Sequence, residues 1–143
     1  GGWLGQSAPV VAGDAANWRI VSRRRPTPEQ WADAIFAWKV CAHVSSNAIV
    51  LASGGVAWGI GAGQQNRVEA AQLAASKAMG RARGGASASD SFYPFPDGIA
   101  AAAEAGVAVV VQPGGAQRDL EIIEEADRLG VAMVFTGERQ FRH

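Results

Sequence analysis

The 143-residue sequence has little of three things: cysteine, net charge and long apolar runs. Cys41 is its only cysteine, which excludes an internal disulfide and a structural zinc site built on several thiolates. Thirteen basic and thirteen acidic side chains cancel, so no overall field draws the chain to nucleic acid or to a membrane. The longest apolar runs, such as Val107 to Val111, are too short for a membrane span, and residues 1–25 lack the apolar core of a signal peptide. We therefore expect a chain of the reducing cytoplasm with neither nucleic-acid nor membrane partners.

The length predicts a single domain over residues 1–143, and the 18 glycines suit close approaches between backbone segments. Residues 1–25 are typical of an irregular or extended entry segment. The basic run Arg23 to Arg25 within it favours a solvated face or a segment contact over an anion site.

Local signals predict a helix and then a hairpin in the first half of the chain. The stretch "TPEQ" is a capping box, with Thr27 at the N-cap, Pro28 at the first helical position and Gln30 at the third. Apolar residues then recur at helical spacing as far as Cys41, which indicates a core stripe. The runs "NAIVLA" and "VAWGI" flank Ser53-Gly54-Gly55, a signal for a hairpin turn.

The remainder predicts alternating helices and strands. An Ala-rich helix is expected from Asn66 to near Gly80, followed by "RARGGASAS" as a flexible polar connection and a Pro-rich irregular stretch. The pattern then predicts helices at 97–106 and 118–130 and strands at 107–111 and 131–135. A strand–helix–strand unit of this kind implies that its two strands pair in parallel. The expected fold class is α/β, a mixed sheet covered by helices.

The stretch "GIGAGQQNR" resembles a phosphate-binding loop, but its spacing fits neither the dinucleotide fingerprint nor the Walker motif. Arg67 would stand in the first turn of the following helix, where the helix dipole disfavours a cation unless an anion is bound. On the residues alone, a tight turn with a surface arginine and an anion site both remain open.

Two further stretches have the same ambiguity. The aromatic run Phe92 to Phe95, closed by Asp97, is either a packed loop with a helix cap or a rigid apolar wall beside a ligand-binding carboxylate. The tail "TGERQFRH" is either a solvated basic end or part of a site.

Taken together and in order, "SNAIV", "GIGAGQQNR", "ASDSFYPFPDG", "QPGGAQRD" and "FTGERQFRH" resemble the last part of the bifunctional purine biosynthesis family. This family joins a phosphoribosylaminoimidazolecarboxamide (AICAR) transformylase to an IMP cyclohydrolase. The resemblance extends over the whole chain, including the opening "GGWLGQ". It implies formyl transfer from 10-formyltetrahydrofolate to AICAR, a three-layer α/β/α, cytidine-deaminase-like subdomain, and active sites formed with the remainder of the transformylase in a homodimer.

The resemblance also assigns roles to individual residues. Asn47, the catalytic candidate, would contact the amine or carboxamide region of AICAR, and Arg67, Phe92 and Arg139 would bind this nucleotide. The two arginines are expected to open onto one cleft. The residues implied for folate are Val68, Asp97, Ala116 and Gln117. Ser46 and Asp90 are implied for a monovalent cation, potassium.

The sequence also departs from the family pattern. The Lys-His-Val-Ser-Pro motif, whose Lys and His assist proton transfer, has no counterpart, because His43-Val44-Ser45 is followed by Ser46. Pro96 replaces a usual arginine, and Gln140 stands where many members have histidine. We therefore expect the isolated chain to be inactive. The alternative function is a non-catalytic nucleotide- or folate-binding module, or a truncated scaffold.

Overall fold

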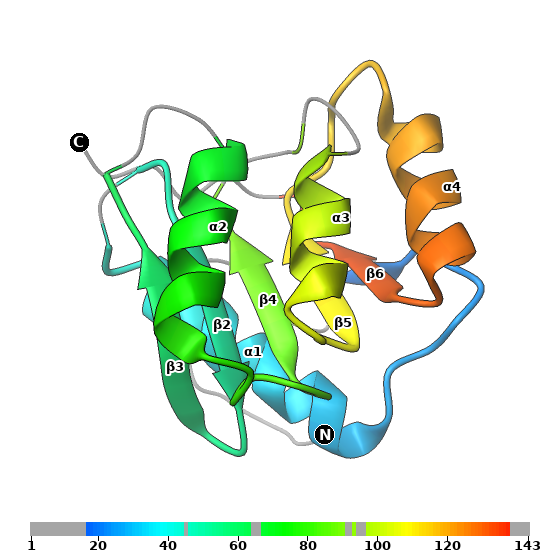
Figure 1. Cartoon of the computed structure of the whole chain (residues 1–143). Coiled ribbons are helices and arrows are strands. Elements are labelled where there is room, and N and C mark those ends of the chain that lie inside the picture. The colour runs from blue at the N-terminus through cyan, green and yellow to red at the C-terminus, as the bar shows by residue number, and fades with distance from the viewer. Residues whose placement is uncertain (1–16, 45, 64–66, 91–92, 94–96, 138–143) are drawn as a thin grey trace.

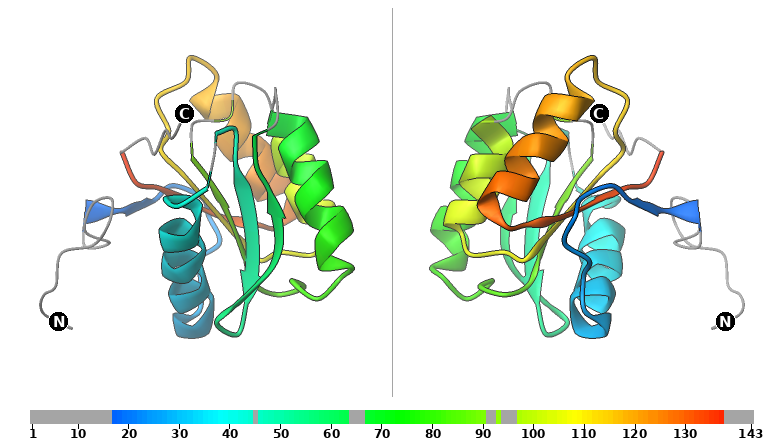
Figure 2. Two further views of the ribbon diagram at one scale, coloured as in Figure 1. Left: turned by 90° about the vertical axis from the view of Figure 1, so that its left-hand side faces the viewer. Right: turned by 90° about the vertical axis from the view of Figure 1, so that its right-hand side faces the viewer.

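A computed structural model describes residues 17–44, 46–63, 67–90, 93 and 97–137, with the backbone alone described at positions 67, 68 and 97. These residues form the predicted three-layer α/β/α arrangement, in which helices lie on both faces of a mixed sheet with six described strands (Figures 1 and 2). Among the described helices, α1 covers one face, and α2, α3 and α4 lie over the other. The elements in chain order are β1 (Arg19–Ile20), α1 (Pro28–Cys41), β2 (Ile49–Ser53), β3 (Val56–Gly61), α2 (Arg67–Ala78), β4 (Ala86–Ser89), α3 (Asp97–Glu104), β5 (Val109–Gln112), α4 (Asp119–Leu129) and β6 (Ala132–Phe135).

The strands lie in the order β1-β6-β5-β4-β2-β3. Strands β4, β5 and β6 are parallel neighbours, whereas β2 is antiparallel to β4 and β3, and β1 is antiparallel to β6. The expected parallel strand–helix–strand unit in the second half of the chain is therefore confirmed, with slightly shifted strand bounds.

Apolar side chains form a core on each side of the sheet. On the α1 side, alanines and valines of the strands pack against Ala34, Trp38 and Cys41, which confirms the predicted stripe as core. Trp18 joins this core from the entry segment, with its ring centroid 5.7 Å from that of Trp31 and 5.8 Å from that of Trp38. The core thus ties the entry segment to α1.

Helix α1 begins with the predicted capping box. Thr27 Oγ1 accepts a hydrogen bond from the Gln30 N–H at 3.1 Å, and the Thr27 N–H donates to Gln30 Oε1 at 2.9 Å. Pro28 starts the helix, where its missing N–H would have had no helical partner. Side chains at both ends of the box therefore satisfy groups that the helix itself leaves unpaired.

Replacing Thr27 by alanine is expected to lower the free energy of unfolding by about 1 kcal/mol, because the Gln30 N–H loses its acceptor. Chemical denaturation of the purified chain measures the change. Thr27→Ser keeps the hydroxyl and is expected to remain near the parent value. Equal losses in the two variants would contradict the capping role.

The hairpin is confirmed as well. Strands β2 and β3 pair in antiparallel register from Ile49 opposite Gly61 to Ser53 opposite Val56. The turn between them is Gly54-Gly55, with φ of 62° and 79°, the backbone region that tight hairpin turns require and that glycine adopts without strain.

The stretch from Arg81 to Ser89 is not a flexible polar connection throughout, so this sequence prediction is wrong. Its last part, Ala86–Ser89, is β4, a buried strand inside the sheet between β5 and β2. Alanine and serine have no marked preference for strands, so no local signal indicated one. Their small side chains let α1 pack closely over the middle of the sheet, and this tertiary burial makes the segment a strand.

Two of the three alternate glycines of "GIGAG" allow close packing of a strand against a helix. Gly59 and Gly61 lie in β3 beneath α2, where an added Cβ would stand 2.0 Å from the carbonyl oxygens of Ala74 and Ala70, respectively. The close backbone approach expected of these glycines is thus an approach of strand to helix.

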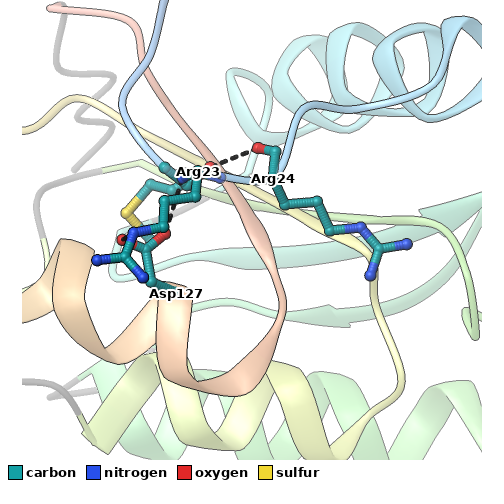
Figure 3. A network of polar contacts seen from close by, with 5 residues as sticks. Arg23, Arg24 and Asp127 are labelled. Carbon is teal, nitrogen blue, oxygen red and sulfur yellow. Dashed lines mark hydrogen bonds and ion pairs between the residues drawn. The ribbon is translucent and has the colours of Figure 1, made fainter.

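The basic run of the entry segment makes a segment contact, one of the two outcomes expected for it. The Arg23 N–H donates to Asp127 Oδ1 at 2.8 Å (Figure 3). The Arg24 guanidinium donates to the Gly130 carbonyl at 3.0 Å. Gly130 caps the C-terminus of α4, where the helix dipole favours a cation. The contacts attach the entry segment to the end of α4.

Candidate functional site

The candidate site is built on one edge of the sheet, which we call the carboxyl edge. The parallel strands β4, β5 and β6 end there at Ser89, Gln112 and Phe135. Ile49, the first residue of β2, pairs with Ser89 on one side and with Gly61, the last residue of β3, on the other. The carboxyl ends of parallel strands are where open α/β sheets commonly bind ligands.

Three helices begin at this edge. Helix α2 starts at Arg67, shortly after β3, and lies antiparallel to it, because Ala70 covers Gly61 and Ala74 covers Gly59. Helix α3 lies between α2 and α4 (Figure 1). Helices α3 and α4 follow the carboxyl ends of β4 and β5 in the chain. Helix N-termini present unpaired N–H groups and the positive end of the dipole, a setting that favours anionic ligand groups.

Most of the residues predicted from the sequence lie in segments of this edge. These positions lie shortly before β2, at the starts of α2 and α3, just after β4, or in the connection from β5 to α4: Ser46, Asn47, Arg67, Val68, Asp90, Asp97, Ala116 and Gln117. For Arg67, Val68 and Asp97 the placement is that of the backbone. Phe92 and Arg139 lie outside the described residues, so the expected cleft shared by Arg67 and Arg139 stays a prediction.

Ser46, Asn47 and Asp90 lie beside the ends of two neighbouring strands, β2 and β4. Ser46 and Asn47 are half-buried just before β2, and Asp90 is fully buried just after β4. The Asp90 N–H donates to the Ala48 carbonyl at 3.3 Å, which holds the two segments together. Carboxylate and hydroxyl oxygens are of the ligand type that hard cations prefer.

The connection between β5 and α4 is shaped by Asp119. Its carboxylate accepts hydrogen bonds from the Gly115 N–H at 2.8 Å and the Ala116 N–H at 3.0 Å. Ala116 is half-buried and Gln117 is exposed. This carboxylate therefore fixes the backbone that leads to the two residues predicted to border folate.

Gln112 is a residue at this edge to which the sequence reasoning gave no role. It ends β5, its side chain is fully buried, and its Oε1 accepts a hydrogen bond from the Tyr93 N–H at 3.1 Å. The sequence does contain a signal for it, because this glutamine directly follows the apolar run Val109 to Val111 and is therefore expected to be buried. A buried side-chain amide needs hydrogen-bonding partners, so such a glutamine is expected to hold another segment.

The surface also has a shallow depression of about 380 Å³ between α2 and α3. Its polar lining includes Gln72, Arg83 and Glu104. None of the predicted site residues that the structure describes lines it. Glu104 ends α3, and Arg83 lies beyond the end of α2. The depression therefore lies at the end of these helices opposite the carboxyl edge.

On α4, the Arg128 guanidinium donates hydrogen bonds to both carboxylate oxygens of Glu125, at 2.9 and 2.6 Å, and this lowers the pKa of the Glu125 carboxyl. Because the folded pKa is depressed, the stabilising effect is present above the ordinary pKa of glutamate and is lost as the pH falls through the folded value. The Arg128 side chain is largely exposed, so solvent screens the pair and its effect is small.

Within the described part of the chain, no group of three or more His, Cys, Asp or Glu side chains is arranged to hold a metal ion. None of the helices among these residues is long and apolar enough to cross a membrane.

The fold is that of an α/β/α domain, and its carboxyl edge is where open sheets of this kind commonly bind ligands. The family model described as "AICARFT/IMPCHase bienzyme" matches residues 1–77, and the chain belongs to this family. The chain is 50% identical over 143 residues to the bifunctional purine biosynthesis protein PurH of Anoxybacillus flavithermus and 47% identical over 143 residues to that of Nostoc. It covers 28% of the length of each of these two relatives. The PurH protein of Sorangium cellulosum is 54% identical over 133 residues, which are 93% of this chain and 26% of that protein.

Proposed function

We propose that this chain acts in purine biosynthesis as the C-terminal portion of an AICAR transformylase, which transfers a formyl group from 10-formyltetrahydrofolate to AICAR. The observation that supports this function best is the gathering of the family-derived site positions at one carboxyl edge, in a chain about 50% identical to PurH proteins. We place the protein in the cytoplasm, as one domain of a homodimer with the remainder of the transformylase.

AICAR would be bound by Asn47, Arg67, Phe92 and Arg139. Asn47 precedes β2 and Arg67 opens α2, and the pairing of Ile49 with Gly61 places these two segments on neighbouring strands. An amide can hydrogen-bond the carboxamide or amine region of AICAR, and arginines suit its phosphate, to which they donate charge-assisted hydrogen bonds.

Folate would be bound by Val68, Asp97, Ala116 and Gln117. These positions belong to the starts of α2 and α3 and to the segment before α4, and α3 contacts both of the other helices. A carboxylate at Asp97 suits the amine and amide donors of a pterin ring, and Ser46 and Asp90 would hold potassium nearby.

The chemistry is the attack of a weakly nucleophilic amine on a formyl carbon. It requires that both reactants be positioned and that a proton be moved from the amine. The residues of this chain would position AICAR and folate. The Lys-His pair that assists proton transfer in the family has no counterpart in this sequence, so the remainder of the transformylase would supply it.

Asp97→Asn tests the proposal, because asparagine keeps the size and one acceptor oxygen of the side chain at the first position of α3 but lacks the carboxylate charge. In the complete polypeptide that contains this chain, we expect folate affinity, measured by calorimetry, to fall by about 10-fold or more, the range for hydrogen bonds to charged groups. The thermal midpoint and AICAR affinity should change little. A lower thermal midpoint with unchanged folate affinity would instead assign Asp97 to stabilising the start of α3. If the parent polypeptide bound both ligands without transferring a formyl group, the alternative of a non-catalytic binding module would hold.

A further inference from the structure

Gln112 is a polar side chain in apolar surroundings. It is fully buried at the end of β5, after three valines of the same strand. Its side-chain amide makes two contacts: Oε1 accepts from the Tyr93 N–H at 3.1 Å, and Nε2 approaches Met133 Sδ at 3.5 Å. A buried amide is unfavourable unless it is hydrogen-bonded, so the Tyr93 contact is what makes glutamine suitable here.

Tyr93 is held at a second point by α3. Its side chain is fully buried, and a Cβ added at Gly98 would stand 2.4 Å from Tyr93 Cδ2 and Cε2. The tyrosine ring therefore lies directly against the first turn of α3, which only glycine at this position permits. Gln112 holds the backbone of Tyr93, and Gly98 accommodates its ring.

Tyr93 lies between two predicted substrate contacts in the sequence, so the contacts that hold Tyr93 bear on substrate binding. Tyr93 directly follows Phe92, the predicted AICAR contact, and lies four residues before Asp97, the predicted folate contact. We propose that Gln112 is a positioning residue for both substrates, which acts by fixing the Tyr93 peptide, next to Phe92 and four positions before Asp97 in the chain. This inference rests on the proposed transformylase function.

The first test is a pair of variants of the complete polypeptide. Gln112→Met keeps the volume of the side chain but removes the acceptor for the Tyr93 N–H, whereas Gly98→Ala displaces the Tyr93 ring and leaves Gln112 intact. We expect each variant to lower kcat/KM for AICAR and for 10-formyltetrahydrofolate by about 10- to 100-fold, the penalty for misplacing reacting groups by up to an ångström. Gln72→Met, the same exchange on an exposed face of α2, is the matched control and should leave both values unchanged.

The second test does not depend on activity. Hydrogen exchange of the Tyr93 amide should be about 10-fold faster in Gln112→Met than in the parent protein, because the hydrogen bond that protects it is gone. An unchanged exchange rate would show that Gln112 does not hold the Tyr93 peptide, and it would overturn the proposal. Faster exchange with unchanged kcat/KM for both substrates would show that the Gln112–Tyr93 hydrogen bond has a structural role only. That result would overturn the positioning role. If the parent polypeptide neither bound nor converted the two substrates, the proposed function would fail, and the exchange result would still report on the contact itself.

Discussion

Replacing Gly59 by alanine is expected to lower the free energy of unfolding by about 3 kcal/mol, near the upper end of the usual cost of overpacking. The new Cβ would stand 2.0 Å from the Ala74 carbonyl oxygen and 2.9 Å from the carbonyl carbon of the same residue. Because both are backbone atoms of α2, no side chain can turn away, and the whole helix must shift from the sheet. Chemical denaturation of the purified chain measures the loss.

Gly54→Ala is the matched control for this prediction. Gly54 lies in the hairpin turn with a φ of 62° and has no atom within 4 Å of an added Cβ. Alanine there meets only the cost of a left-handed backbone, about 1 kcal/mol. If Gly59→Ala cost no more than Gly54→Ala, the tight contact between β3 and α2 would not be a major source of stability.

Replacing Arg67 by alanine is expected to weaken AICAR binding by about 1.5–3 kcal/mol, the range for hydrogen bonds to charged groups. Arg67 is the first residue of α2, where the helix dipole disfavours a cation and a nucleotide phosphate would relieve the conflict. Calorimetric titration of the complete polypeptide with AICAR measures the effect. Folate affinity, titrated separately, should change much less.

The same dipole argument separates a binding role from a structural one. Removal of an unfavourable cation from a helix N-terminus should leave the thermal midpoint of the ligand-free protein unchanged or slightly higher. Arg83→Ala removes the same charge beyond the other end of α2 and should leave AICAR affinity at the parent value. A drop in thermal midpoint without loss of AICAR affinity would make Arg67 a structural residue.

Several elements of the fold could be predicted because their signals are local. The capping box at Thr27 and Gln30 satisfies its own backbone groups, so it needs no distant partner to specify the start of a helix. The Gly54-Gly55 turn likewise joins β2 to β3 through the backbone region that glycine adopts freely. The candidate site could be anticipated only through the resemblance of five ordered motifs to a family, because individually each motif permitted a purely structural interpretation.

The sequence by itself determined where most helices and strands form, because capping, turn chemistry and apolar periodicity act over a few neighbouring residues. Only the tertiary structure decided that Ala86–Ser89 is a buried strand, that Gly59 makes room for α2, and that Gln112 holds the peptide of Tyr93. Gln112 and Tyr93 are 19 positions apart in the chain, and Gly59 and Ala74 belong to different elements. The energies of such contacts depend on which segments the fold brings together, and local sequence does not encode this.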